Sequence, residues 1–287
     1  MYFVQVYSLY KSLPRFYISD MVKDSSVTSL DAQMEADYRQ DVIFMKSELM
    51  KAKAFESSKL YYAFKVTSNA AILASAVAAI VLLNGMSGAV ICGVLMALFW
   101  QQCGWLAHDF LHYQVFTNRM NNNLAGLCIG NIWQGFSTAC WKTKHNHHHA
   151  SPDVVHTEAG GDPDTSTMPL LLWSEKIIEG DSEDLKDLPR FMVRHQKPVL
   201  LPSTDGLYSN IMAAAVTSLS TGAVRKYVGG LPMKIAEIST FVLHYAAVVY
   251  ITTLLETAAL RIFFHLICHS LGGLFIAVVF TVGQRFL

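Results

Sequence analysis

Residues 66–107 read VTSNAAILASAVAAIVLLNGMSGAVICGVLMALFWQQCGWLA, and this stretch contains no charged side chain. Its first part, residues 66–83, is long enough to cross the roughly 30 Å hydrocarbon core of a bilayer as an α-helix. Asn84 and Gly85 form a typical turn sequence, and residues 86–107 make a second apolar run. We therefore predict two membrane-spanning helices joined by a short turn, which is a helical hairpin.

A second pair of apolar runs follows near the end of the sequence, at residues 235–255 and 262–282. Both runs again have the length of a membrane span. The composition agrees, because only 15% of the residues are charged and 52% are hydrophobic, whereas soluble domains carry about 25% charged residues. We predict an all-α membrane protein with four transmembrane helices in two hairpins.

The charges predict an orientation and exclude one class of partner. Lysines lie on the outer flanks of the first hairpin and its turn has none, so the positive-inside rule makes the flanks cytosolic. The 22 basic and 22 acidic residues balance, which argues against nucleic acid, whose binders need a basic surface. Residues 18–60 combine alternating charges with apolar positions at helical spacing, which predicts a cytosolic amphipathic segment. Residues 113–205 are expected to form a polar cytosolic cap, within which residues 124–138 are interfacial.

Two histidine clusters follow the first hairpin, H-D-F-L-H at residues 108–112 and H-N-H-H-H at residues 145–149. On a helix, side chains three or four positions apart project from one face. Imidazole binds zinc, copper, iron and nickel, and five or more nitrogens exceed what one tetrahedral zinc takes. The clusters therefore predict a histidine-rich helical cap with a dinuclear iron site. The predicted metal ligands are His108, His112, His145, His148 and His149.

Other polar residues are predicted to support or to lie apart from this site. Asp109 and Asn146 stand beside the ligands, and we expect them to orient imidazoles through the second ring nitrogen. His265 and His269 fall in the last span, toward its lumenal end. We expect them to lie too far from the clusters to bind the same metal.

The two clusters lie in longer stretches that resemble a known family. QQCGWLAHDFLH (101–112) and GNIWQGFSTACWKTKHNHHH (130–149) resemble the first and second histidine boxes of membrane fatty acid desaturases. They are most similar to front-end desaturases, which make polyunsaturated fatty acids. DPDTSTMP at 162–169, Glu237 with His244, and LGGLFIAVVFTVG at 271–283 also resemble that family. The resemblance covers roughly residues 40–284.

The resemblance implies an activity and its partners. Two iron ions held by histidines activate dioxygen, and a cis double bond is introduced into a polyunsaturated acyl chain, in unsaturated fatty acid biosynthesis. Electrons come from NADH or NADPH through a reductase and cytochrome b5. The family further implies an integral membrane protein of the endoplasmic reticulum, with the histidine boxes in the cytosol. The five predicted ligands match the family's ligand positions, and His147 takes the variable place. The sequence decides neither the position of the new bond (Δ5, Δ6 or Δ8), nor whether the carrier is acyl-CoA or a phospholipid.

Two features of the family are missing from this sequence. It contains neither the third histidine box, Gln-x-x-His-His, nor the His-Pro-Gly-Gly heme motif of a fused cytochrome b5 domain. YKSLPRFY at 10–17 resembles the tail of such a domain, so we interpret residues 1–17 as that tail and residues 61–287 as an incomplete desaturase domain. We expect a fragment, a splice form or an inactive copy. Because two irons share five imidazoles, we expect weak iron binding and little or no desaturase activity from this chain alone.

Three other interpretations remain open. A desaturase-like lipid hydroxylase uses the same iron centre to insert oxygen, and a non-catalytic chain would pair with a full-length desaturase. H-D-F-L-H could also be a variant of the zinc helix H-E-x-x-H of membrane metalloproteases, with Asp109 as the base. The second histidine cluster is surplus for such a protease.

Overall fold

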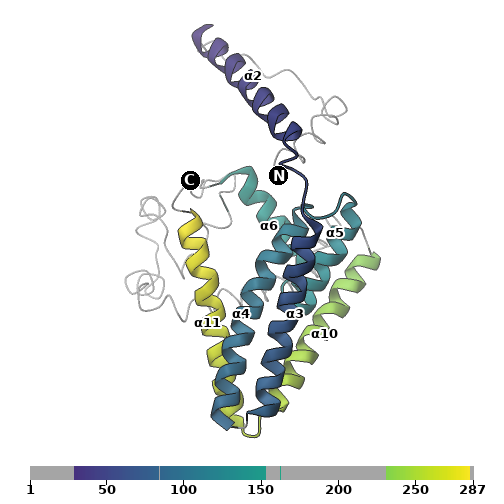
Figure 1. Ribbon diagram of the computed structural model, residues 1–287, viewed down its shortest axis with the longest axis vertical. Helices are drawn as coiled ribbons and strands as arrows, with labels where there is room; N and C mark the ends of the chain where they lie inside the picture. The colour runs from purple at the N-terminus through teal and green to yellow at the C-terminus, as the bar shows by residue number, and fades with distance from the viewer. Residues whose placement is uncertain (1–28, 84, 153–161, 163–230, 285–287) are drawn as a thin grey trace, which may run out of the picture.

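The computed structural model describes residues 29–83, 85–152, 162 and 231–284. These residues form helices and no strand (Figure 1). In chain order the helices are α2 (Ser29–Lys51), α3 (Lys59–Leu82), α4 (Gly85–Leu111), α5 (Arg119–Gly126), the π-helix η2 (Leu127–Gln134), α6 (Thr138–Ala150), α10 (Leu231–Thr253) and α11 (Ala258–Gln284).

Four of these helices are long and apolar enough to cross a membrane: α3, α4, α10 and the Ala258–Ile276 part of α11. The predicted all-α class with four membrane helices is therefore confirmed. The first span begins earlier than its apolar run, because Ser58 caps α3 by accepting a hydrogen bond from the backbone N–H of Tyr61. This extension places Lys59, Tyr61 and Tyr62 on the helix rather than in a loop.

Helix α4 is the centre of the bundle. In its most apolar stretch 56% of the residues are buried, compared with 17–22% in the other three spans. The reason is that α3, α11 and η2 all pack against α4. Phe99 and Cys103 lie in this core and are almost completely buried. The two predicted hairpins differ in their packing. Helix α3 packs on α4, whereas α11 packs on α4 and α10 packs on η2, so α10 and α11 contact each other little beyond their connecting turn.

The segment between α4 and α6 returns the chain along the bundle. Asn122 is fully buried, and its side chain bonds the backbone of Val115 and Phe116, which fixes the turn after α4. Helix η2 then packs between α4 and α10. It is followed by Gly135, whose φ of +88° is a left-handed conformation that favours glycine. A β-carbon there would come within 2.3 Å of His244 Nε2 on α10, so glycine also permits this close packing.

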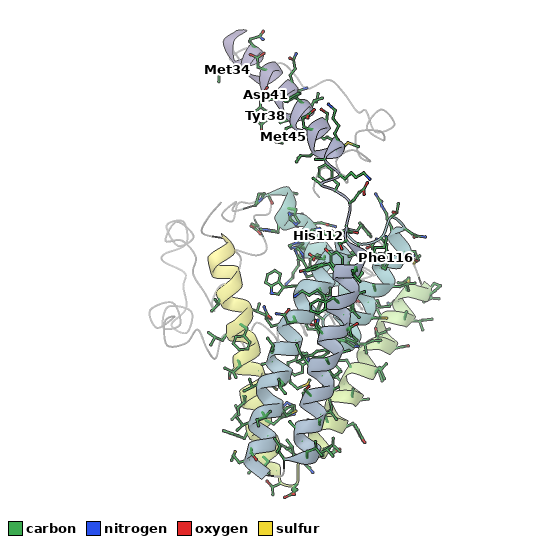
Figure 2. The ribbon with its side chains drawn as sticks, viewed as in Figure 1. Met34, Tyr38, Asp41, Met45, His112 and Phe116 are labelled. Carbon is green, nitrogen blue, oxygen red and sulfur yellow. The ribbon has the colours of Figure 1, made fainter. Side chains whose placement is uncertain are left out.

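Helix α2 forms most of the described part of the predicted amphipathic segment. It projects away from the membrane helices, and Met34, Tyr38 and Met45 are exposed along it (Figure 2). The predicted orientation relative to the cytosol stays a prediction. Residues 1–28, which include the predicted cytochrome b5 tail at 1–17, and most of the predicted polar cap lie outside the described residues.

Candidate metal centre

The first histidine cluster stands at the end of α4. His108 lies in the last turn of this helix, and His112 follows it directly. The backbone N–H of His112 bonds the carbonyl of His108 at 3.0 Å, which continues the helical turn. The two rings therefore lie on one side, with their centroids 4.4 Å apart.

The second cluster stands on α6, whose start is anchored to α10. Ser137 caps the helix by accepting a hydrogen bond from the N–H of Cys140, at 3.0 Å. Its hydroxyl donates in turn to the carboxylate of Glu237, which also accepts from the N–H of Ala139 at 3.3 Å. Glu237 is fully buried on α10. A carboxylate at a helix N-terminus is also attracted by the positive end of the helix dipole. This contact fixes where α6 points, and with it the position of the second cluster.

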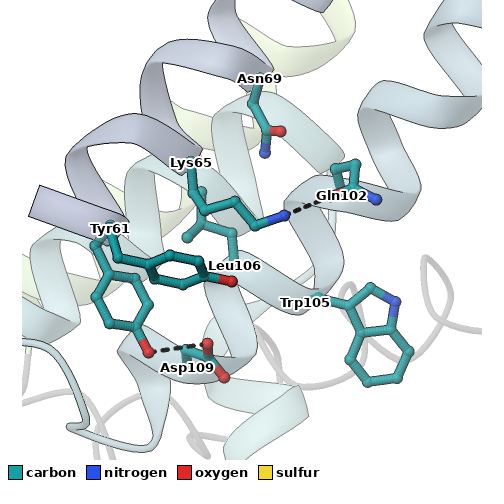
Figure 3. A pocket seen from close by; sticks show the side chains of 8 residues that line it. Tyr61, Lys65, Asn69, Gln102, Trp105, Leu106 and Asp109 are labelled. Atoms are coloured by element: carbon teal, nitrogen blue, oxygen red, sulfur yellow. Dashed lines mark hydrogen bonds between the residues drawn. The ribbon is translucent and has the colours of Figure 1, made fainter. Parts of the chain in front are cut away.

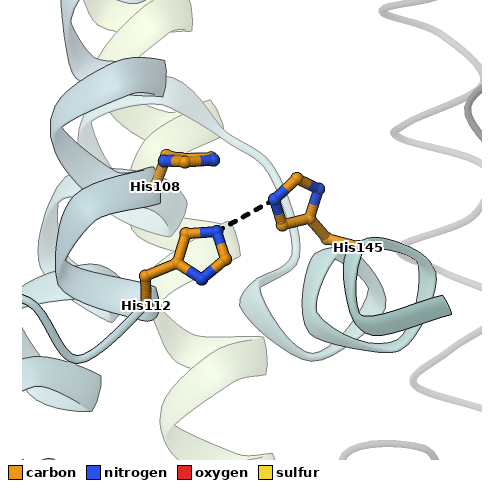
Figure 4. A group of neighbouring side chains, drawn as sticks. All are labelled: His108, His112 and His145. Atoms are coloured by element: carbon orange, nitrogen blue, oxygen red, sulfur yellow. Dashed lines mark hydrogen bonds between the residues drawn. The ribbon is translucent and has the colours of Figure 1, made fainter. Parts of the chain in front are cut away.

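Three histidines from these two elements converge on one point. The Nε2 atoms of His112 and His145 are 3.0 Å apart, those of His149 and His112 3.2 Å, and those of His149 and His145 2.9 Å. His108 joins them, because its ligand nitrogen lies within 4.8 Å of those of His112 and His145 (Figure 4). The structure thus brings together four of the five predicted ligands.

Hydrogen bonding alone cannot satisfy such a triangle. Each Nε2 atom is either a donor or an acceptor, so at least two of three mutually adjacent nitrogens must be of the same kind and repel each other. A cation at the centre would accept all three lone pairs. With a metal–nitrogen distance of about 2.1 Å, two ligands at right angles are about 3.0 Å apart. The observed separations of 2.9–3.2 Å therefore fit three imidazoles on one metal ion.

The local environment keeps these imidazoles in the form that binds metal. Burial, with the neighbouring His108 and His149, lowers the pKa of His112 to about 3. Burial, with the neighbouring His108 and His112, lowers the pKa of His145 to about 2. Burial also lowers the pKa of His149. All three rings are therefore neutral near pH 7, and neutral imidazole is the metal ligand.

His148, the fifth predicted ligand, has a different partner. Its Nδ1 lies 2.8 Å from Oδ2 of Asp162, which is fully buried. Because a carboxylate only accepts, Nδ1 is the donor, and in the neutral ring Nε2 then carries the lone pair that a metal needs. Carboxylates commonly orient metal-binding histidines in this way. The sequence alone does not assign this role to Asp162, although Asp162 begins the DPDTSTMP stretch that resembles the family.

The two residues predicted to orient ligands behave differently from each other. Asp109 accepts a hydrogen bond from the hydroxyl of Tyr62 at 3.1 Å, and its other oxygen lies 3.5 Å from Nδ1 of His108, which is a long contact. Asn146 is exposed on α6, and no described residue hydrogen-bonds its side chain. Trp141 was not predicted, yet its ring stacks on His145 at 4.3 Å between centroids and at an angle of 27°.

The histidines inside the bundle are separate from this centre. His244 is buried, and its Nδ1 donates to the carbonyl of Ile132 at 2.9 Å, which ties α10 to η2. On α11 the rings of His265 and His269 stack on each other, and that of His269 stacks on Trp100. Together with Cys268, these two histidines form a group distinct from the one at the end of α4.

Comparison with known proteins identifies the family. The profile named "Fatty acid desaturase" matches residues 84–285, which include both histidine clusters. The chain belongs to the fatty acid desaturase family. The resemblance to membrane fatty acid desaturases is therefore confirmed, and the four helices that are long and apolar enough to cross a membrane agree with it.

Several curated relatives of this desaturase family member are named as fatty acid desaturases. It is 41% identical over 172 residues to an acyl-lipid (9-3)-desaturase of Physcomitrium patens, covering 60% of this chain and 31% of that protein. It is 33% identical over 191 residues to a Delta(8)-fatty-acid desaturase of Euglena gracilis, covering 67% and 42%. It is 30% identical over 274 residues to a Delta(6)-fatty-acid desaturase of Caenorhabditis elegans, covering 91% and 58%. The aligned parts thus span between 31% and 58% of these relatives. No solved structure matches the chain.

Proposed function

We propose that this chain takes part in the front-end desaturation of a polyunsaturated acyl chain, with iron bound at the histidine centre. The observation that carries this proposal is the triangle of Nε2 atoms from His112, His145 and His149, with separations of 2.9–3.2 Å. Family membership supports the choice of acyl desaturation over peptide hydrolysis.

The proposed reaction removes two hydrogens from adjacent methylenes and leaves a cis double bond. Dioxygen, two electrons and two protons balance the reaction and give two waters. Iron bound at the site supplies the activation of dioxygen. The electrons are proposed to come from NADH or NADPH through a reductase and cytochrome b5. The substrate is proposed to be the acyl chain of an acyl-CoA or a phospholipid, and the location the endoplasmic reticulum with the histidines on the cytosolic side.

The protein's own contribution is to hold and orient the ligands. His108, His112, His145, His148 and His149 are the proposed ligands, and Asp162 fixes the ring of His148 by its hydrogen bond. Trp141 covers one face of His145 and limits its rotation. The ligands come from two helices that are anchored in the bundle. The positions of the ligand nitrogens are therefore set before metal binds, which is the preorganisation that a functional site needs.

The number of ligands sets an expectation for activity. The described residues bring three Nε2 atoms to one point, with His108 beside it. Two ions sharing five imidazoles each have few ligands, so we propose that this chain alone binds iron weakly and produces little desaturated product. The Asp109-based protease alternative has no similar support among the comparisons.

The test is to express the chain with cytochrome b5 and its reductase in a host that makes no polyunsaturated fatty acids. The cells are fed a polyunsaturated acid, and gas chromatography with mass spectrometry locates any added double bond. A product that disappears in the His145→Ala variant establishes desaturation and contradicts the expected low activity. An inserted hydroxyl group instead would show a hydroxylase. A purified chain that binds zinc but no iron, and yields neither product, would overturn the proposal.

A further inference from the structure

A cavity lies beside the histidine centre, between α3 and α4, and its lining residue Asp109 contacts His108. Its volume is about 150 Å³, which is room for roughly five water molecules at about 30 Å³ each. The side chains that line it include three aromatic rings, one cation and one carboxylate (Figure 3). Those used below are Tyr61, Tyr62, Lys65, Gln102, Trp105 and Asp109.

The two charges lie at different depths in the bundle. Lys65 donates to the Oε1 atom of Gln102 at 3.2 Å, and Gln102 lies two turns before the end of α4. Asp109 accepts from the hydroxyl of Tyr62 at 3.1 Å and lies in the last turn of α4. Seven residues of helix correspond to about 10 Å along its axis. The cation is therefore nearer the middle of the span, and the anion is nearer its end.

A zwitterionic phospholipid carries its charges in the complementary order. Its phosphate is next to the glycerol and the acyl chains, and its amine lies farther out toward water. We propose that this cavity binds the headgroup of a zwitterionic phospholipid, with the phosphate at Lys65 and the amine at Asp109. Lys65 has three donor hydrogens, so its bond to Gln102 leaves it able to bind a phosphate oxygen.

The aromatic side chains suit the amine of such a headgroup. The rings of Tyr61 and Tyr62 meet at 82° with centroids 5.3 Å apart, so their faces form a corner. Trp105 lines the same cavity. Aromatic faces bind quaternary ammonium groups by cation–π attraction. A choline headgroup is therefore favoured, whereas an anionic headgroup such as glycerol phosphate has no positive group to place beside Asp109.

The surroundings place this cavity at a lipid surface. On α3, Leu60 is 82% exposed and Phe64 is 66% exposed, next to the lining residues Tyr61 and Lys65. Large apolar side chains on a membrane helix face acyl chains, and lysine and tyrosine gather where the span meets the headgroups. A lipid in the neighbouring leaflet can thus insert its headgroup without leaving the bilayer.

Lipid binding is measured directly and needs no turnover. The purified full chain in detergent is mixed with equal amounts of phosphatidylcholine and phosphatidylglycerol of identical acyl chains, and bound lipids are counted by native mass spectrometry. We expect phosphatidylcholine to bind roughly tenfold more tightly, because cation–π and ionic contacts of this kind contribute about one factor of ten. Tyr61→Leu and Lys65→Gln should each reduce its binding severalfold, whereas Tyr61→Phe should retain it.

Matched controls come from the same part of the chain. Phe64→Leu removes an exposed aromatic ring outside the cavity, and Lys53→Gln removes an exposed lysine from the preceding turn. Neither should change lipid binding. Equal binding of the two lipids, or unchanged binding in Tyr61→Leu and Lys65→Gln, overturns the proposal. Glycerophosphocholine has the headgroup without acyl chains, and if it binds as tightly as the lipid the ligand is a soluble phosphocholine and the lipid assignment is wrong.

Discussion

Asp162 and His148 form a buried hydrogen bond, 2.8 Å between Oδ2 and Nδ1. The two residues lie 14 positions apart in the sequence, and the bond holds Asp162 against α6. A buried carboxylate is costly unless it is paired, and the imidazole is its partner. The bond also selects the ring nitrogen that His148 can offer to a metal.

We therefore predict that Asp162→Ala weakens metal binding roughly 10- to 100-fold, as loss of such a partner does in other metal sites. Asp162→Asn keeps an acceptor oxygen and should lose less. Iron affinity, measured by competition with a chelator of known affinity, checks both. Unchanged affinity in Asp162→Ala would show that His148 is no ligand.

His145 and His147 provide a matched pair on α6. The Nε2 atom of His145 belongs to the triangle, whereas His147 is exposed. We expect the His145→Ala variant to lose most of its bound iron and the His147→Ala variant to retain it. Inductively coupled plasma mass spectrometry of the purified chains measures the iron content. Equal losses in the two variants would contradict the proposed ligand set.

Metal binding should be visible in the fluorescence of Trp141. Its ring stacks on His145 at 4.3 Å, so a paramagnetic iron ion on that imidazole will quench its emission. We predict that iron lowers the tryptophan fluorescence, that a chelator restores it, and that Trp141→Phe removes most of the change. A change that persists in Trp141→Phe would place the metal elsewhere.

Glu237 holds the start of α6 through Ser137 and Ala139. Glu237→Ala leaves buried donors without an acceptor, which costs about 1–3 kcal/mol in the free energy of unfolding. We expect a lower melting temperature and weaker iron binding together, because the ligands on α6 lose their anchor. Glu237→Gln keeps one acceptor and should recover part of both. Glu256→Ala, at an exposed position after α10, is the control.

Gly135 and Gly85 separate two causes of instability. Both have a positive φ, +88° and +69°, but a β-carbon at Gly135 would collide with His244, whereas at Gly85 it would meet nothing within 4 Å. We predict that Gly85→Ala costs about 1 kcal/mol from backbone strain and that Gly135→Ala costs clearly more. Chemical unfolding of the purified variants in detergent measures the difference. Equal costs would mean that His244 moves aside freely.

The sequence predicts the spans and the histidine faces because both depend on local spacing. An uncharged run sets the length of a membrane helix, and the separations between His145, His148 and His149 place them on one side of α6. Local spacing does not predict that α11 packs on α4 rather than on α10, because the sequence of an apolar helix does not specify which helix it contacts.

Contacts between residues far apart in the chain explain what sequence reasoning missed. Glu237 accepts hydrogen bonds from Ser137 and Ala139, about a hundred residues earlier in the chain. No local sequence pattern predicts such a contact. Asn146 is next to His145 in the sequence but exposed in the structure, because adjacent positions on a helix project in different directions. Its role in orienting a ligand stays a prediction. Asp162 lies fourteen residues beyond His148, so its hydrogen bond to that ring could be found only from the structure.

Helix α6 is attached to α10 at its start and offers metal ligands at its end. A ligand that binds only the folded form stabilises the whole fold, including contacts that the ligand does not touch. Iron at the histidines would therefore also strengthen the seating of α10, even though α10 contributes none of the proposed ligands. A chain without iron would therefore keep the same four membrane helices but have a lower free energy of unfolding, with part of the loss at the contact between Glu237 on α10 and the start of α6.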